Sequence, residues 1–188
     1  MQLEVMDKPR RLKWWQLALL TIVVTALGGL SGRKSKRSER KLYNKELKQA
    51  PWAPPAWVFG PAWTVNNFFV LQALRKLIQE TGSHKKKMLT LQVFIWIIFF
   101  SFNYIYFKRK STVLAAIWSM TDAALAAASF TIALRSNKQL AWRYLPLLAW
   151  TGYASSLASY QALENRDVLL NTPPLLPAVK KALSNGVK

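Results

Sequence analysis

Cysteine is absent from this sequence of 188 residues, which excludes disulfides, thiolate metal ligands and cysteine nucleophiles. The one histidine, His84, lies beside three lysines and has no second histidine or carboxylate at ligand spacing, so no metal site is expected there. Acidic residues are scarce, with 8 Asp and Glu against 27 Lys and Arg. The sequence shows no paired carboxylates, no Ser/His/Asp set and no glycine-rich phosphate loop. It therefore gives no support for catalysis by recognisable side-chain machinery.

The basic residues are gathered into short clusters. These clusters occupy residues 8–13, 33–48, 85–87, 108–110 and 135–143, with long uncharged stretches between them. A net charge of +19 is typical of nucleic-acid-binding proteins when the basic residues are spread over a folded surface, but the clustering argues against a nucleic-acid partner. A charge in hydrocarbon costs roughly 2.5 to 3.5 kcal/mol even on lenient scales. The pattern therefore predicts a protein embedded in a lipid bilayer.

Five apolar stretches are long enough to cross that bilayer. We expect transmembrane helices at about residues 14–30, 59–77, 89–107, 113–134 and 145–163. The predicted fold class is an all-α, polytopic membrane protein with a five-helix bundle at residues 14–165. A basic N-terminal segment at 1–13 precedes it, and a C-terminal tail at 166–188, surface-bound or disordered, follows. The first stretch lacks a small-residue cleavage site and is interpreted as a retained helix.

The charges do not set the orientation of this bundle. With five spans, one side of the membrane holds 12 Lys and Arg and the other side holds 15. So small a difference does not decide the topology. Nor does the sequence indicate which membrane holds the protein.

A segment rich in proline and tryptophan connects the first two spans. Within residues 50–57, Pro51, Pro54 and Pro55 prevent a regular helix and favour an extended or turned path. We expect this segment at the membrane surface. Pro61 suits the first turn of the second span, because a proline there loses no helical hydrogen bond.

Small residues gather at the end of the first span. Gly28, Gly29 and Gly32 either permit the close approach of a neighbouring helix or form a flexible helix end. The sequence leaves both interpretations open.

Residues 52–64 carry a family resemblance. They read WAPPAWVFGPAWT, which resembles the signature of the TspO/MBR family, the tryptophan-rich sensory proteins related to the mitochondrial translocator protein. That family's pattern is approximately W-x-P-P-x-W-x-F-G-P-V-W-T and enters its second helix. Two prolines, three tryptophans and the FGP element match in one register, which makes the signal specific.

Weaker landmarks extend the resemblance over roughly residues 14–165. Gln92 looks like part of the family's third helix, and Asp122 falls where the family often has an aspartate. Pro146, Trp150 and Ala154 match the spacing of a segment of its fifth helix. We interpret the chain as a divergent member.

The departures from the family pattern lie at polar positions. Two asparagines, one in the third helix and one in the fifth, are replaced here by Trp96 and Ala158, and new amides appear at Asn66 and Asn67. These changes affect ligand contacts more than the fold.

The resemblance implies a cavity inside the bundle that binds a flat hydrophobic molecule, with porphyrin, haem or a sterol-like lipid as candidates. It implies a role in sensing, tetrapyrrole handling or transport. The residues expected at the site are Trp63, Trp96, Trp150, Ala154, Asn67 and Asp122, and those expected in a lid loop are Trp52, Pro54, Pro55 and Trp57. The alternative for the tryptophans is packing alone.

The polar residues within the spans allow two interpretations. Asp122 is the only acidic residue inside a predicted span and is a functional candidate by default. It could instead bond to the hydroxyl of Ser119 or Thr121. Asn67 and the other amides hydrogen-bond either a ligand or a neighbouring helix.

Two further functional hypotheses stand beside ligand binding. One is an enzyme-like activity in which light and oxygen degrade a bound porphyrin, with tryptophans as redox partners. The other is a subunit whose helices pack against a larger membrane complex or a second copy of the chain, giving a homodimer. The expected partners are thus a hydrophobic small molecule and the lipid bilayer, and no resident cofactor is certain.

Overall fold

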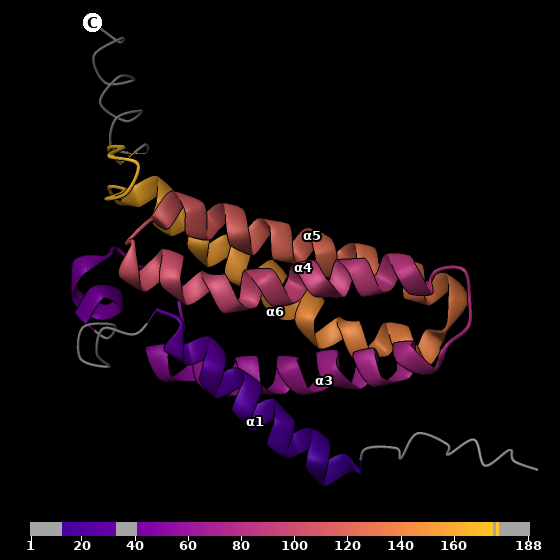
Figure 1. Cartoon of the computed structure of the whole chain (residues 1–188). Coiled ribbons are helices and arrows are strands. Elements are labelled where there is room, and N and C mark those ends of the chain that lie inside the picture. The colour runs from indigo at the N-terminus through magenta and orange to yellow at the C-terminus, as the bar shows by residue number, and fades with distance from the viewer. Residues whose placement is uncertain (1–12, 33–40, 175, 177–188) are drawn as a thin grey trace, which may run out of the picture.

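The computed structural model describes residues 13–32, 41–174 and 176. The long helices are α1 (Trp14–Leu30), α3 (Phe59–Gln79), α4 (Lys85–Asn103), α5 (Thr112–Ser136) and α6 (Lys138–Glu164). The short ones are η1 (Leu42–Glu46), η2 (Ala56–Val58) and η3 (Tyr104–Lys108), which continues α4. Figure 1 shows α3 to α6 running side by side, with α1 slanted against them. The described residues form no β-strand, which confirms the predicted all-α fold class.

The helices extend beyond the apolar stretches at their charged ends. α1 has the predicted bounds, but α4 begins at Lys85 instead of residue 89, and α6 begins at Lys138 instead of residue 145. A helix does not stop where the hydrocarbon stops, because the headgroup region tolerates lysine and arginine. The start of α6 is set by Asn137, whose side chain accepts the backbone N–H of Leu140 at 3.2 Å.

The core of the bundle combines large side chains on α3, α4 and α6 with alanines on α5. α5 and α6 make the most extensive contact between helices, and α6 also packs against α3. Alanine permits this close approach in a membrane, where packing replaces the hydrophobic effect as the driving force. The buried core residues are Val70, Ala73, Leu77, Met88, Ile95, Ala126, Ala133, Leu140, Ala141, Tyr144 and Leu147.

Hydrogen bonds between side chains tie the helices together. Gln92 of α4 donates to the carbonyl of Val70 on α3 at 2.7 Å and accepts from the hydroxyl of Tyr144 on α6 at 2.6 Å. Asn67 of α3 donates to the hydroxyl of Thr25 on α1 at 2.9 Å. An unpaired polar group is costly in lipid, so these bonds decide which helix faces meet.

Two glycines let the end of α1 lie against α4. A Cβ added at Gly28 would overlap the ring of Phe99, and one added at Gly32 would overlap the backbone carbonyl of Asn103. The amide of Asn103 also donates to the carbonyl of Gly28 at 2.9 Å. Gly29, by contrast, has open space around an added Cβ. Close approach of a neighbouring helix is therefore the role of Gly28 and Gly32.

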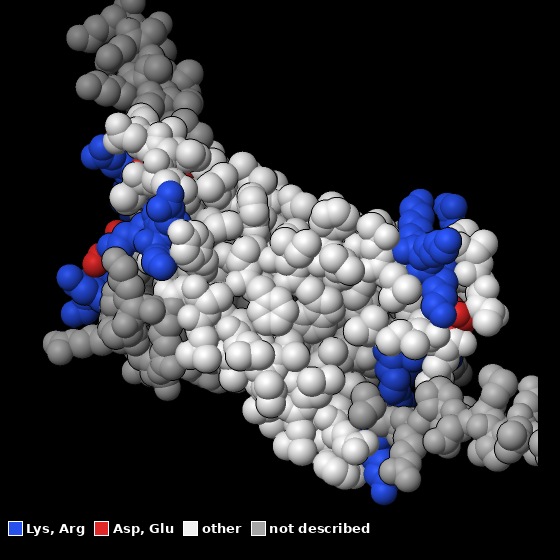
Figure 2. All heavy atoms as spheres, viewed as in Figure 1, with Lys and Arg blue, Asp and Glu red and all other residues white. Residues whose placement is uncertain are grey.

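One face of the bundle is apolar in its middle and basic at its ends. Figure 2 shows Lys and Arg at the two ends of the face in view, with an uncharged band between them. The segments Lys85–Lys108 and Thr112–Ser136 are long and apolar enough to cross a membrane, and Trp14–Leu30 is a shorter apolar helix. Large apolar side chains exposed on the helices, such as Ile22, Ile97 and Ile117, would be unfavourable in water and are suited to lipid. The chain is a multi-pass integral membrane protein, as the sequence predicts.

Segments far apart in the sequence meet at one end of the bundle, which we call the loop end. It is made by residues 41–58, residues 104–112 and residues 164–174 (Figure 1). Asp167 joins two of these segments, since its carboxylate accepts from the hydroxyl of Ser111 at 2.6 Å and the N–H of Val113 at 2.9 Å. The start of the predicted tail is thus folded against the bundle. The segment 1–12 and the tail from residue 175, apart from Leu176, lie outside the described residues.

Candidate ligand-binding site

Trp150 of α6 lies in an aromatic cluster at the loop end. Its ring meets Phe59 of α3 edge to face, with 5.7 Å between ring centroids, and lies 5.7 Å from Tyr153 one turn along α6. Tyr43 of η1 packs against Phe59 at 5.5 Å. We call Tyr43, Phe59, Trp150 and Tyr153 the lid cluster. Within it the indole Nε1 of Trp150 is buried and has no hydrogen-bond partner among the described residues.

Trp52 attaches the proline-rich loop to α6 through hydrogen bonds and a ring contact. The indole N–H of Trp52 donates to the hydroxyl of Ser156 at 3.2 Å, and its carbonyl accepts from the hydroxyl of Tyr153 at 2.8 Å. Its ring meets Tyr160 edge to face at 5.5 Å. The loop is therefore attached to α6 beside the lid cluster.

The other predicted lid residues differ in their surroundings. The carbonyl of Pro54 accepts from the hydroxyl of Tyr43 at 2.9 Å. Burial raises the pKa of Tyr43 to about 12, so this hydroxyl keeps its proton at neutral pH. Pro55 precedes η2 and is exposed, and Trp57 is 72% exposed. Pro54 thus helps to anchor the loop, whereas Trp57 lies on the surface.

Amide side chains bind the start of the loop to the end of α6. Asn165 accepts from the N–H of Lys48 at 2.7 Å and donates to the carbonyl of Lys48 at 3.0 Å. Gln161 donates to the side chain of Gln49 at 2.6 Å and accepts from the hydroxyl of Tyr106 at 2.9 Å. Lys48 and Gln49 therefore attach the start of the loop to the end of α6, in addition to the attachment through Trp52.

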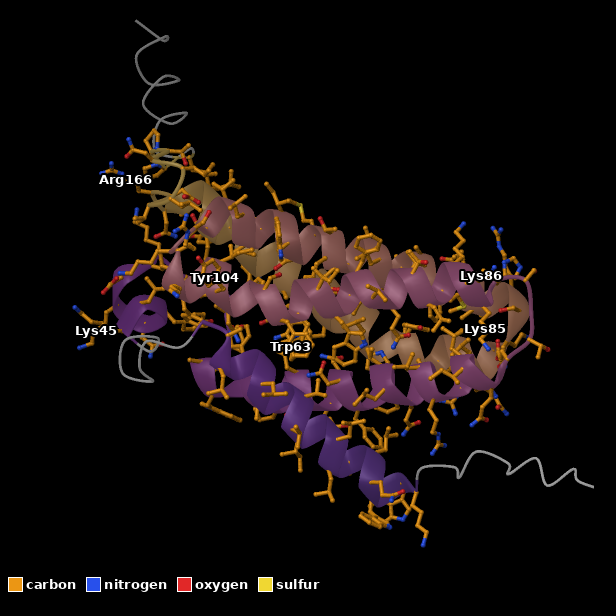
Figure 3. The ribbon with its side chains drawn as sticks, viewed as in Figure 1. Lys45, Trp63, Lys85, Lys86, Tyr104 and Arg166 are labelled. Atoms are coloured by element: carbon orange, nitrogen blue, oxygen red, sulfur yellow. The ribbon has the colours of Figure 1, made fainter. Side chains whose placement is uncertain are left out.

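Trp63 and Trp96 belong to a second aromatic cluster, between α3 and α4. Trp63 packs against Phe99 at 5.4 Å, and Figure 3 shows its side chain directed from α3 towards α4. Trp96 contacts Phe99 at 5.8 Å and Phe100 at 6.0 Å. Because Phe59 and Trp63 are four residues apart on α3, the two clusters are neighbours along that helix.

The remaining predicted site residues lie in three different environments. Asn67 is turned towards α1 by its bond to Thr25. Asp122 of α5 is 2% exposed, and its Oδ1 has no hydrogen-bond partner among the described residues. Ala154 is half-buried on α6, one turn after Trp150. The grouping of all these residues into one ligand site remains a prediction.

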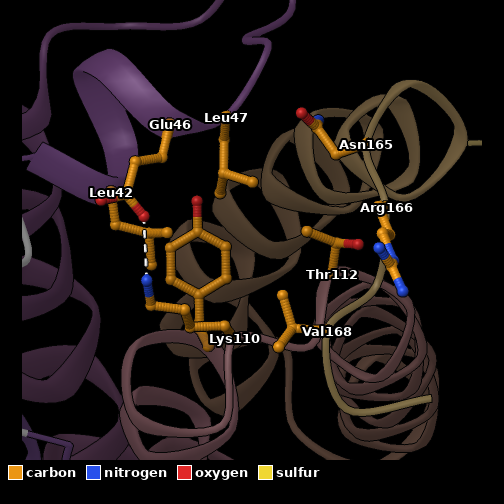
Figure 4. Close-up of a pocket in the computed structure, with 9 residues that line it drawn as sticks. Leu42, Glu46, Leu47, Lys110, Thr112, Asn165, Arg166 and Val168 are labelled. Atoms are coloured by element: carbon orange, nitrogen blue, oxygen red, sulfur yellow. Dashed lines mark hydrogen bonds and ion pairs between the residues drawn. The ribbon is translucent and has the colours of Figure 1, made fainter. Parts of the chain in front are cut away.

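Two of the hollows on the described part of the chain are lined by neither Trp63 nor Trp150. One, of about 500 Å³, lies on α4 and is lined by Val93, Trp96, Ile97, Phe100 and Ser101. The other, of about 230 Å³, lies at the loop end and is drawn in Figure 4. Of the predicted cavity tryptophans, Trp63 and Trp150 pack against neighbouring rings, whereas Trp96 lines the hollow on α4.

Several side chains of the lid cluster, and Gln161 near it, were not predicted as site residues. Phe59 and Tyr153 carried a usable signal, because Phe59 belongs to the FGP element and Tyr153 follows Trp150 by three residues on one helix face. Tyr43 and Gln161 carried none, since their contacts depend on how the basic connection folds back onto α6.

A comparison with protein families supports what the fold and the 52–64 string indicate. The sequence profile of the TspO/MBR family matches residues 18–163, from α1 to the last turn of α6, and includes both aromatic clusters. A comparison with curated proteins finds no match. Since the family profile covers most of the sequence and the structure is a helical membrane bundle, the chain belongs to the TspO/MBR family.

Proposed function

We propose that the protein binds a flat hydrophobic ligand, a porphyrin, haem or sterol-like lipid, beneath the proline-rich loop and beside Trp150. A membrane sensory or ligand-binding role in general follows from membership of the family. Sensing, tetrapyrrole handling or transport of that ligand is part of the proposal. The observation that carries it is the buried indole N–H of Trp150, which has no partner in the described part of the chain and lies next to the rings of Phe59 and Tyr153.

The lid cluster around Trp150 suits a planar ligand with a hydrogen-bond acceptor at its edge. Aromatic rings offer flat apolar walls, and few polar groups are needed to orient a ligand among them. A buried donor without an acceptor costs about 1 to 3 kcal/mol. A porphyrin carboxylate or a sterol hydroxyl oxygen at the Trp150 Nε1 would remove that cost on binding.

Access to Trp150 requires the loop to lift from α6. Trp52 is hydrogen-bonded to Ser156 and Tyr153, and Lys48 is bonded to Asn165. These contacts close the loop end over the lid cluster. Binding is therefore expected to proceed through a minor open form of the loop.

The proposal is tested by titrating protoporphyrin IX into the purified protein in detergent and following porphyrin absorbance. Trp150→Phe keeps an aromatic ring but removes the donor, so we expect about tenfold weaker binding. Trp142→Phe is the matched control, because Trp142 is on the same helix and is 65% exposed. It should leave the affinity unchanged.

A wider replacement tests the position of the site. If Trp63→Leu combined with Trp150→Leu binds protoporphyrin as tightly as the unaltered protein, the ligand lies elsewhere. Measuring the mass of the particle in detergent, with and without ligand, shows in the same samples whether a second copy of the chain takes part.

Light-dependent breakdown of the bound porphyrin is a second candidate, supported by the ring contact between Trp150 and Tyr153, two oxidisable side chains. The protein-porphyrin complex is illuminated in air beside a dark sample and beside free porphyrin. Breakdown predicts a loss of porphyrin absorbance faster than for the free compound. Plain binding predicts no such acceleration.

A further inference from the structure

The hollow at the loop end is a pocket separate from the aromatic rings of the lid cluster. It has a volume of about 230 Å³ and forms where η1, the end of η3, the start of α5 and the chain after α6 meet (Figure 4). Leu42 and Leu47 contribute apolar wall from one side, and Val168 contributes it from the other. Lys110 and Thr112 of the lining lie between and at the start of the two segments that are long and apolar enough to cross a membrane, Lys85–Lys108 and Thr112–Ser136.

One buried polar group in this pocket is left without a partner. Thr112 is 2% exposed, and its hydroxyl oxygen has no hydrogen-bond partner among the described residues. In Figure 4 this hydroxyl points towards the side of the pocket where Arg166 lies. Buried hydroxyls normally hydrogen-bond, so the group is suited to a ligand that enters the pocket.

Basic side chains, Lys110 and Arg166, lie on opposite sides of the pocket. Lys110 pairs with Glu46 at 2.9 Å, and Glu46 also lies 3.6 Å from Lys41, so this carboxylate is already neutralised. Arg166 on the opposite side is exposed and donates to the side chain of Asn171. That bond uses one of the five N–H donors of a guanidinium. The guanidinium of Arg166 is therefore the cation on the side of the pocket away from Glu46, where the carboxylate of Asp167 is already bonded to Ser111 and Val113.

The backbone of the pocket is held in an unusual conformation. Lys110 has a φ of 53°, in the left-handed region that residues with a Cβ rarely adopt. Its carbonyl accepts from the N–H of Val168 at 3.4 Å, which joins the two walls.

We propose that this pocket binds a phosphate group, carried by an anionic phospholipid, with the Arg166 guanidinium and the Thr112 hydroxyl as its partners. Guanidinium groups bind phosphate through paired, charge-assisted hydrogen bonds. The lipid source follows from position, because the pocket lies where the two membrane-length apolar segments Lys85–Lys108 and Thr112–Ser136 adjoin. Next to Val168, Leu169 and Leu170 are 36% and 45% exposed and offer contacts for acyl chains.

The experiment uses the full chain in neutral detergent and counts bound lipid by native mass spectrometry. The probes are dioleoyl phosphatidylglycerol, dioleoyl phosphatidylcholine and inorganic phosphate. We expect the anionic lipid to bind more tightly than the zwitterionic one. Arg166→Gln should weaken binding of the anionic lipid about tenfold. Arg109→Gln is the matched control, because Arg109 is exposed at the same end but does not line the pocket.

A second variant separates binding from folding. Thr112→Val keeps the shape of the side chain and removes the unpaired hydroxyl. We expect an unchanged or higher unfolding temperature without lipid, together with a several-fold loss of affinity for phosphatidylglycerol. Equal losses in the Arg166 and Arg109 variants, or full affinity in the Thr112 variant, would overturn the proposal. Binding of inorganic phosphate that depends on Arg166, without binding of the lipid, would overturn the lipid source.

Discussion

Asp167 shows how a single residue holds the loop end together. Its carboxylate accepts from Ser111, Val113 and Leu170, at 2.6, 2.9 and 2.7 Å. Burial by itself raises the pKa of Asp167, but these hydrogen bonds outweigh it and hold the pKa below the usual aspartate value. The ionised side chain therefore stabilises the fold above the pKa of the unfolded chain. This contribution is lost as the pH falls through the lower pKa of the folded state.

Replacing Asp167 by Asn should lower the free energy of unfolding by about 1 to 3 kcal/mol near neutral pH, because the amide has no charge and only one acceptor oxygen. The difference from the unaltered protein should shrink below about pH 4, where aspartate gains a proton. Thermal unfolding in detergent between about pH 7 and about pH 3 measures both effects. A difference that does not depend on pH would contradict this account.

At the scale of an element, α1 depends on few contacts. Its buried residues are Leu17, Thr21 and Gly28, and much of the rest of its surface is exposed. Its place in the bundle relies on the close approach to α4 at Gly28 and Gly32 and on the bond between Thr25 and α3. A small change at either contact should therefore loosen the helix.

Gly32→Ala should destabilise the bundle by about 1 to 3 kcal/mol, because the added Cβ meets a backbone carbonyl of α4 that cannot rotate away. Gly29→Ala is the control, since its Cβ enters open space and alanine favours the helix. The midpoint of unfolding by sodium dodecyl sulfate measures the two effects. If both variants shift it equally, the contact with α4 is not the cause.

At the scale of the whole molecule, the proposed function makes the loop the element that controls access to the lid cluster. The loop is bonded to α6 through Trp52 and through Lys48, whereas the rings of the cluster come from α3, α6 and η1. Weakening one loop bond should increase the population of the open form without removing any aromatic wall.

Tyr153→Phe removes the hydroxyl that holds the Trp52 carbonyl and retains the ring beside Trp150. Because one hydrogen bond contributes about 0.5 to 1.5 kcal/mol, protoporphyrin should associate several-fold faster, as measured by stopped-flow absorbance. Tyr104→Phe, at an exposed tyrosine outside the lid, should leave the rate unchanged. Association that is unchanged or slower in the Tyr153 variant would show that the loop does not limit access.

The sequence by itself determined the membrane class, the all-α fold class and the family. These follow from local properties, namely the length of apolar stretches, the cost of charge in lipid and the order of residues in the 52–64 string. Helix bounds were predicted least well at Lys85 and Lys138, because charged residues continue a helix into the headgroup region.

Only the tertiary structure decided which side chains share a space. It placed Trp63 and Trp150 in separate clusters, turned Asn67 towards α1, and joined Gln49 of the loop to Gln161 of α6. None of these pairings is encoded by spacing along one helix, because each depends on the rotation and depth of two helices packed against each other. The pocket at Arg166 has the same origin, since it exists only where three distant segments meet at one end of the bundle.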